Sequence, residues 1–541
     1  MTDGDALYRA IVARPEDDTP RLVYADWLEE NGHEEEAEFI RLDCRLEAST
    51  PDLPEYAELM ERRDELRLWL LTHAPKKLKK KFAGSLLEVG SNWWMDTCRG
   101  FPRYLACENS GRRFGTKGIR RLAAALEKAF ATLPTRWLVV GFPAVEDLAE
   151  FLKQPVVSAL DRISISTNEQ TGDDAARLIA DCRQLRTLRG LALQFPVGEA
   201  GAAALGRSEN LGRIEWFWLD TLQFDPAAMR LLGMGGWFSN LRQLFLNEGL
   251  AVEAFEDLCR FQPFSCLHTL ALSGNSLPHT SWQSFARSRT FPQLNRLVLD
   301  DADMSNGQMA VLAAANGLQL TALDLAHCSI GNEGVGALVN APFAESLQWL
   351  DLTSNRLGPL AARTIAKCRK LLNLKHLALA GNPIAGSGLK AIAESPNLHK
   401  LISLLLGERA VGPRNLLSTA CHEFLEKLDM PKLRHLSLSG LPIDARSVRL
   451  LAEVKFHNLT RLGLANCKLT DEAIPDLLGS PALQGLIELN LNGNSLKTGV
   501  SPLTDRQILP RLSMCSLSDN LMAADLRRKL ARRPGVIVSN K

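Results

Sequence analysis

One spacing recurs along most of this 541-residue chain, Leu-x-x-Leu-x-Leu-x-x-Asn/Cys. Its clearest copies begin at Leu267, Leu320, Leu347, Leu374, Leu459 and Leu486. The second apolar position returns at intervals of about 27 residues from Ile163 to Cys515, within the range of stacked repeat arrays. A unit of this size buries its apolar side only against its neighbours. The spacing therefore predicts one long repeat array in place of several separate globular domains.

The pattern inside each repeat predicts a short strand followed by a helix. Apolar residues alternate in Leu-x-Leu, so they share one face of a strand. The Asn or Cys that follows can satisfy backbone groups of the neighbouring coil that a tight turn would leave unpaired. Segments such as 333–339 and 360–366 have helical spacing and small residues. The sequence predicts an α/β solenoid, a curved horseshoe with parallel inner strands and outer helices.

This long, helix-bearing repeat resembles the ribonuclease-inhibitor-like subclass of leucine-rich repeats over roughly residues 135–540. The resemblance implies a binding surface but no particular partner, because one fold serves many functions. Two places depart from the period. The step from Leu404 to Leu436 is long, which predicts an insertion within 407–432. The step from Leu191 to Ile214 is short and the next, to Leu244, is long, which predicts a less regular N-terminal part.

A second resemblance lies near the N-terminus. The segment Arg21–Glu30 reads RLVYADWLEE, and Glu38–Leu42 reads EFIRL. Both strings are similar to those of a bacterial family, the repeat-companion domain, which precedes repeat arrays and has no activity implied by the resemblance. We expect Trp27 to pack in a helical core and Asp26 to pair with Arg21 or Arg41.

The expected domain organisation has four parts. These are a small all-α repeat-companion domain at 1–74, a basic linker and N-terminal cap at 75–134, leucine-rich repeats at 135–521 and a C-terminal cap at 522–541. The first part is acidic, with 20 Asp and Glu against 7 Lys and Arg up to Leu66. The five lysines between Lys76 and Lys81 are expected to form a solvated linker.

Composition and motifs favour a non-enzymatic protein. A formal net charge of +1 disfavours nucleic acid and membrane partners. The sequence contains no apolar run long enough to predict a transmembrane helix, and its first residues are acidic, unlike those of a secretory signal. The eleven cysteines lack CxxC pairs, which favours reduced thiols in a cytoplasm. The protein is also expected to be a monomer. No phosphate loop, nucleophile elbow or metal-ligand spacing is present, so no catalytic residue, metal or cofactor is predicted.

The predicted function is a scaffold that binds an unidentified protein on the concave face of the array. Residues between and beside the repeat leucines should point to that face, and aromatic and Arg side chains dominate interface energies. The candidate partner-binding residues are Arg213, Glu215, Phe217, Phe245, Arg296, Asp300, Asp324, Trp349 and Asp351. Trp216 is expected in the core. Two alternatives stay open: a regulator or adaptor of an enzyme, GTPase-activator-like or ligase-adaptor-like, and an enzyme with a site in residues 1–130.

Overall fold

The structure is a computed structural model. It describes residues 2–48, 56–73, 88–89, 97–98, 101–102, 104–107, 113–220, 226–261, 263–407, 414–454 and 456–538. The chain divides into two compact units. The first comprises Met1–Leu53 and Pro75–Val298, and the second comprises Pro54–Ala74 and Leu299–Lys541. The lysine run that begins at Lys76 lies outside the described residues.

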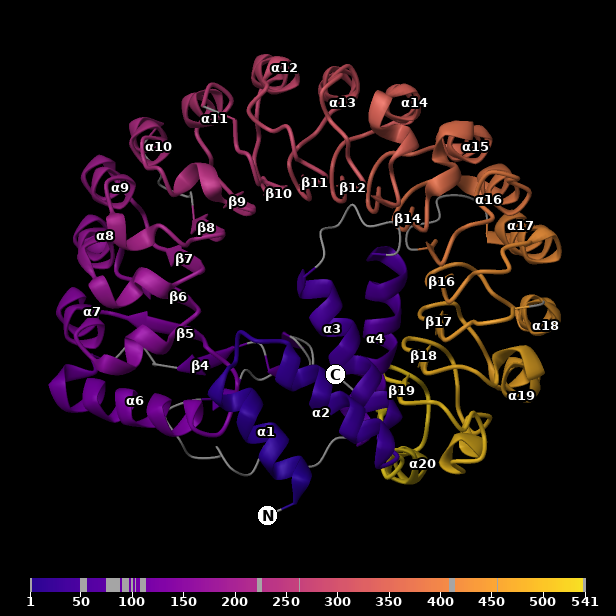
Figure 1. The fold of residues 1–541 in the computed structure, drawn as a ribbon. Helices are drawn as coiled ribbons and strands as arrows, with labels where there is room; N and C mark the ends of the chain where they lie inside the picture. The colour runs from indigo at the N-terminus through magenta and orange to yellow at the C-terminus, as the bar shows by residue number, and fades with distance from the viewer. Residues whose placement is uncertain are drawn as a thin grey trace. The chain divides into compact units, whose positions relative to one another are not determined.

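The first unit places parallel strands on its inner side and helices on its outer side (Figure 1). Its parallel strands are β4 (Leu105–Cys107), β5 (Trp137–Phe142), β6 (Arg162–Thr167), β7 (Gly190–Gln194), β8 (Trp216–Asp220), β9 (Gln243–Asn247), β10 (Thr269–Ala271) and β11 (Arg296–Val298). The outer helices are α6 (Gly115–Phe130), α7 (Val145–Leu152), α8 (Gly172–Asp181), α9 (Glu199–Gly206), α10 (Pro226–Gly233), α11 (Val252–Leu258) and α12 (His279–Arg287).

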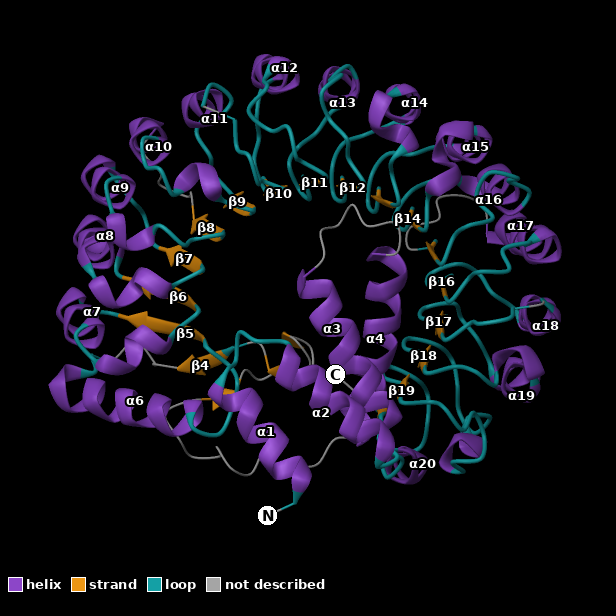
Figure 2. Cartoon of the chain, viewed as in Figure 1, coloured by secondary structure: helices purple, strands orange, loops and turns teal. Residues whose placement is uncertain are grey.

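The second unit repeats the same alternation of strand and helix (Figure 2). Its parallel strands are β12 (Ala322–Asp324), β13 (Trp349–Asp351), β14 (His376–Ala378), β15 (Ser403–Leu405), β16 (His435–Ser437), β17 (Arg461–Gly463), β18 (Glu488–Asn490), β19 (Met514–Ser516) and β20 (Val536–Ile537). The helices between them are α13 (Asn306–Ala313), α14 (Asn332–Asn340), α15 (Pro359–Lys367), α16 (Ala385–Ala393), α17 (Arg414–Lys427), α18 (Ala445–Glu453), α19 (Ile474–Gly479) and α20 (Ala524–Leu530). The predicted α/β solenoid is confirmed.

The repeat asparagines join successive coils, as their position in the motif predicts. Asn382 is buried, and its amide nitrogen donates to the carbonyl of Leu352, one repeat earlier, at 2.7 Å. Its amide oxygen accepts from the backbone N–H of Leu357 at 3.1 Å. Cys328 takes the same place in its repeat and donates to the carbonyl of Leu299 at 3.2 Å. Burial raises the pKa of the Cys328 thiol to about 11, so this position is structural.

The predicted irregularity before β9 comes from one misassigned strand. Phe217, not Ile214, pairs with Leu191 on one side and with Leu244 on the other. The steps are then 26 and 27 residues, in line with the rest of the array. The period is therefore regular through this part of the first unit.

The extra residues between Leu404 and Leu436 lengthen the outer helix of that repeat. Helix α17 has 14 residues, whereas α16 and α18 have nine each. The five extra helical residues match the excess length of that step. The strands on either side, β15 and β16, pair in the ordinary register, with Leu404 opposite Leu436.

The N-terminal helices α1 (Asp3–Ala13), α2 (Thr19–Glu30) and α3 (Glu34–Ala48) belong to the first unit. Trp27 and Tyr24 pack against a small buried cluster contributed by α2 and α3. Arg41 pairs with Asp26 at 2.6 Å, as the sequence predicts. Arg136 attaches this bundle to the array by donating to the carbonyl of Val12 at 3.1 Å. The bundle is therefore fixed to the start of the strand layer.

Helix α4 (Tyr56–His73) belongs to the second unit, although the sequence on both sides of it belongs to the first. Its helical character agrees with the sequence, which extends the helical region through residues 54–73. The boundaries proposed from sequence, with 1–74 as one domain, stay a prediction.

Candidate functional site

The inner face of the first unit carries a continuous row of aromatic rings, which we call the aromatic row. It consists of Tyr104, Trp137, Trp216, Trp218 and Phe245. Neighbouring rings lie 5.4–6.3 Å apart between centroids, the spacing of edge-to-face and offset-stacked pairs. All are half-buried except Trp216, which is 8% exposed. The row offers a preorganised apolar surface on a rigid sheet.

Small residues on β6 and β7 make room for this row. Trp137 on β5 and Trp216 on β8 lie 5.4 Å apart although two strands separate them. Arg162 and Gly190 lie in register between them, and the next inner-face positions hold the short side chains of Ser164 and Ala192. The Trp137 indole donates to the Ser164 hydroxyl at 3.2 Å, so the two indoles extend over these short side chains.

The corresponding inner-face positions of the second unit are polar and charged. One row, in register across β13 to β18, contains Trp349, His376, Ser403, His435, Arg461 and Glu488. The rings of Trp349 and His376 stack at 3.6 Å with planes 7° apart. Where the first unit has the aromatic row, the second unit thus has a row that begins with the indole of Trp349 and ends with the ionisable side chains of Arg461 and Glu488.

Burial keeps the histidines of this row neutral. It lowers the pKa of His376 to about 3, and the nearby Arg461 charge acts in the same direction. Neither ring nitrogen of His376 has a hydrogen-bond partner among the residues that the structure describes. Burial, with the charges of Arg461 and His376, also holds the pKa of His435 well below its ordinary value. These imidazoles are therefore uncharged at neutral pH.

Helix α4 supplies carboxylates to this face of the second unit. The guanidinium of Arg434 donates through Nε to Glu65 at 2.6 Å, and the Thr460 hydroxyl donates to the same carboxylate at 2.6 Å. Arg461 donates to Glu61. Burial raises the pKa of Glu65, but the bonds and charge of Arg434 outweigh it and hold that pKa below its ordinary value. Figure 1 shows α4 beside strands β16 to β19.

The structure puts the nine predicted partner-binding residues in three kinds of place. Inner-face strand positions hold Phe245, Arg296, Asp324, Trp349 and Asp351, all half-buried. Asp300 follows β11 and is half-buried, while Arg213 and Glu215 precede β8. The expectation for Phe217 is wrong: its side chain is 0% exposed and packs 5.3 Å from the Trp237 ring in the core.

The error at Phe217 has a simple cause. Residues alternate between the two faces of a strand, so a slip of one position exchanges them. Ile214 had been given the place that Phe217 occupies, and the assignments of Phe217 and Trp216 were exchanged with it. Trp216 is buried, as expected, but under its aromatic neighbours on the inner face and not among the repeat leucines.

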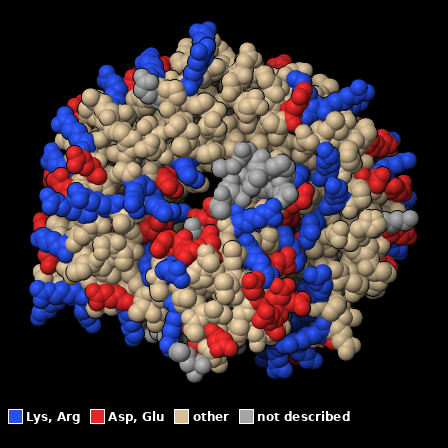
Figure 3. Space-filling view, in the orientation of Figure 1, with Lys and Arg blue, Asp and Glu red and all other residues tan. Residues whose placement is uncertain are grey.

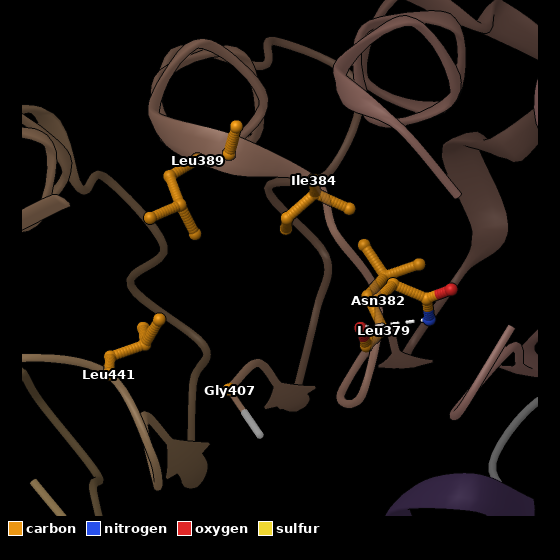
Figure 4. A pocket seen from close by; sticks show the side chains of 7 residues that line it. Leu379, Asn382, Ile384, Leu389, Gly407 and Leu441 are labelled. Atoms are coloured by element: carbon orange, nitrogen blue, oxygen red, sulfur yellow. Dashed lines mark hydrogen bonds between the residues drawn. The ribbon is translucent and has the colours of Figure 1, made fainter. Parts of the chain in front are cut away.

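The structure also contains a cleft and a small cavity, in addition to the two rows described above. In the first unit, a cleft of about 700 Å³ is lined by arginines that carboxylates partly neutralise, for example Arg162 with Glu47 at 2.6 Å. In the second unit, a cavity of about 10 Å³ lies among Leu379, Ile384 and Leu441 (Figure 4). A volume that small admits about one water molecule. The small cavity is a packing gap.

Lys and Arg side chains are interspersed with Asp and Glu over the face shown in Figure 3, in keeping with the net charge of +1. Within the described ranges, no group of three or more His, Cys, Asp or Glu could hold a metal ion. Nor does any described helix combine the length and apolar character needed to cross a membrane.

Comparison with known proteins agrees with the repeat geometry. The family model for the leucine-rich repeat matches residues 320–339 and 370–393, which cover strand-and-helix units of the second unit. The chain is a leucine-rich-repeat protein. Its helix-bearing repeats extend beyond the matched residues into both units.

Curated relatives of this leucine-rich-repeat protein include one cattle and one human sequence. Each is named NACHT, LRR and PYD domains-containing protein 5. The Bos taurus protein is 26% identical over 271 residues, which are 47% of this chain and 23% of the relative. The Homo sapiens protein is 30% identical over 247 residues, 42% of this chain and 20% of the relative. The chain therefore spans less than a quarter of the length of these relatives.

Solved structures that match this chain include an internalin from Listeria monocytogenes and the yeast Rad7 and Elc1 complex. The internalin gives a TM-score of 0.38 at 18% identity and covers 76% of this chain and 94% of its own. The Rad7 and Elc1 complex gives a TM-score of 0.38 at 16% identity, and the match covers 90% of this chain and 94% of the matched chain.

Sequence reasoning missed the two features that define the site. The aromatic row was hidden because placing Ile214 where Phe217 belongs shifts β8 by three residues and exchanges its two faces. Trp137, Trp216, Trp218 and Phe245 are nevertheless visible as aromatics close to repeat strands. The position of α4 was hidden because Glu61 and Arg461 are separated by 400 residues. The acidic excess before Leu66 was the only sequence signal for that contact.

Proposed function

We propose that this leucine-rich-repeat protein is a non-enzymatic scaffold that binds a protein partner through the inner sheet face of its first unit. The observation that carries the proposal is the aromatic row, five adjacent rings on a rigid sheet. Trp and Tyr are enriched among the residues that dominate interface energies. Contiguous apolar surface on a folded protein commonly marks an interaction site.

The row lies beside charged groups that would form a polar rim. Arg162 places its guanidinium 5.6 Å from the Trp137 ring, and the cleft next to it contains Arg189, Arg213 and Arg242. Glu215 lies 3.9 Å from Arg242 across the same edge. An apolar centre with a mixed-charge rim is the usual composition of a protein interface. Arg213 and Glu215 are therefore proposed as rim residues and Phe245 as a central one.

The test is affinity capture from the native cell extract with the full chain and with a Trp218→Ala/Phe245→Ala variant. The control variant, Met234→Ala/Leu360→Ala, truncates two exposed apolar side chains outside the inner face. We expect wild type and control to retain the same partner and the aromatic variant to lose at least nine-tenths of it, with unchanged circular dichroism. Equal recovery by the folded aromatic variant would contradict the proposed site.

The same capture separates a scaffold from a regulator or adaptor of an enzyme. A regulator would change the turnover of a captured enzyme when the purified chain is added, whereas a scaffold would leave it unchanged. An enzymatic activity located in residues 1–130 would persist in the aromatic variant, because the variant changes Trp218 and Phe245, which lie outside that segment.

A further inference from the structure

The second unit holds helix α4 against its inner face in the manner of a bound peptide. Three glutamates of α4 pair with three basic residues that belong to different repeats. Glu58 lies 2.9 Å from the Lys375 ammonium, Glu61 pairs with Arg461, and Glu65 pairs with Arg434. The two guanidinium groups and the ammonium group thus bind carboxylates at helix positions i, i+3 and i+7.

For the first and last of these pairs, the spacing along the helix agrees with the spacing across the sheet, while the middle glutamate, Glu61, reaches Arg461 on the next strand, β17. Helix positions i and i+7 are about 10.5 Å apart along the axis at a rise of ~1.5 Å per residue. Lys375 precedes β14 and Arg434 precedes β16, so two strand spacings of ~4.8 Å separate them. One helix with this pattern can therefore contact both basic residues at once. A one-turn shift along the helix would break the match.

Buried groups add to this pairing. Glu65 has 0% side-chain exposure and Glu61 has 7%, so both carboxylates are withdrawn from water. Leu59 and Leu66, one on each side of this pair in sequence, are also buried. A buried carboxylate is costly unless it is paired and hydrogen-bonded. The basic residues of this face consequently select a helix that carries carboxylates in this pattern over a neutral or basic one.

The origin of the helix suggests a replaceable occupant. Segment Pro54–Ala74 joins the second unit while the residues before and after it join the first, so α4 reaches this face as a separate segment. Tethering gives such a segment an effective concentration in the millimolar range. A helix from another protein with the same pattern would compete with it.

We propose that Lys375, Arg434, Thr460 and Arg461 form a binding site for an acidic amphipathic helix of a partner protein, and that α4 occupies this site in cis as a competing ligand. This site would be a second partner surface of the scaffold. It depends on the proposed function only in the assumption that the repeats bind proteins. The proposal names the partner by chemistry: a helix with carboxylates at i, i+3 and i+7 flanked by apolar residues.

The test measures binding of a fluorescein-labelled peptide of residues 54–74 to the full chain by anisotropy. One chain is wild type, and the other carries Glu61→Gln/Glu65→Gln in its own α4, which weakens the cis occupant. We expect the labelled peptide to bind the Gln variant at least tenfold more tightly than wild type. A peptide that carries the same two Gln substitutions should bind at least tenfold more weakly than the unchanged peptide.

Two controls keep the result specific. The full-chain variant Glu30→Gln/Glu34→Gln makes the same charge change at exposed residues of the N-terminal helices and should behave as wild type. Adding Lys375→Glu to the Gln variant should abolish binding of the unchanged peptide, and a Glu58→Lys peptide should restore it. The restoration would fix the register of the bound helix.

Three outcomes would overturn the proposal. Equal affinity of wild type and Gln variant for the peptide would show that α4 does not compete. Failure of the Gln variant to fold would make α4 a structural part of the unit and not a ligand. A concentration-dependent dimer would assign the site to α4 of a second copy. None of these outcomes bears on the aromatic row, whose test uses other residues.

Discussion

The two units build the same repeat backbone with different side chains. In the first unit, β5 and β6 have six residues each and the inner face is aromatic. In the second, β13 to β18 have three residues each and the inner face is polar and charged. The repeat leucines fix the backbone in both units, so the side chains at the positions between them are free to differ.

The cores differ as well. The first unit fills the space behind its strands with rings, such as Phe238, which packs against Trp237, Phe261 and Phe264. The second unit has a series of buried asparagines that join adjacent coils, as at Asn355, Asn382 and Asn494, whereas in the first unit Asn275 makes the same bond. Ring-to-ring packing thus marks the core of the first unit, whereas asparagine hydrogen bonds between coils recur along the second. Three measurements can sharpen or break this contrast.

The largest expected effect is in the aromatic core of the first unit. Phe238→Ala should lower the free energy of unfolding by about 4 kcal/mol, because it removes a fully buried ring and leaves a cavity. Urea unfolding with hydrogen exchange, resolved by peptide, should place the loss in β8 to β10. Phe238→Leu should cost less than half as much. Equal costs for the two variants would mean that ring shape does not matter here.

The next effect is in the asparagine ladder of the second unit. Asn382→Ala should cost about 3 kcal/mol, because it leaves several buried backbone groups without partners. Among them are the Leu352 carbonyl and the Leu357 N–H. The exposed Asn340, which also donates to a backbone carbonyl, provides the matched control, and its change to Ala should cost under about 0.5 kcal/mol. A similar small cost at Asn382 would remove the distinction between the two cores.

The smallest effect is the response to acid. The pKa of His376 is about 3 in the folded second unit against an ordinary value of 6.5, so the unfolded chain takes up this proton first as the pH falls. Stability present above pH 6.5 is then lost progressively toward pH 3. At pH 5 the loss from His376 is about 2 kcal/mol, and His435 adds to it in the same direction.

Hydrogen exchange at pH 7.5 and pH 5 would test this acid response. Among the described residues of the first unit no histidine is buried, so its strands should change less. His376→Phe should reduce the acid sensitivity of β13 to β16 while keeping a flat ring beside Trp349. Equal acid sensitivity of the two units, or of wild type and variant, would contradict the role assigned to the buried imidazole.

The sequence by itself determined the architecture. The Leu-x-x-Leu-x-Leu spacing gave the strands of the second unit in their observed register, and the Asn and Cys positions gave the bonds between coils. These features are local and repeated, so each copy supports the interpretation of the next. The insertion at 407–432 was also visible, because a long step in a regular array can only add length to one repeat.

Tertiary structure alone decided which side chains the inner faces present. The register of β8 depended on pairing with β7 and β9, because Ile214, Trp216, Phe217 and Leu219 offer two alternations that local sequence cannot separate. The aromatic row exists only when strands bring its rings together over short side chains. The partner of α4 depended on contacts across 400 residues, since helical periodicity specifies a helix but not the surface that its carboxylates meet.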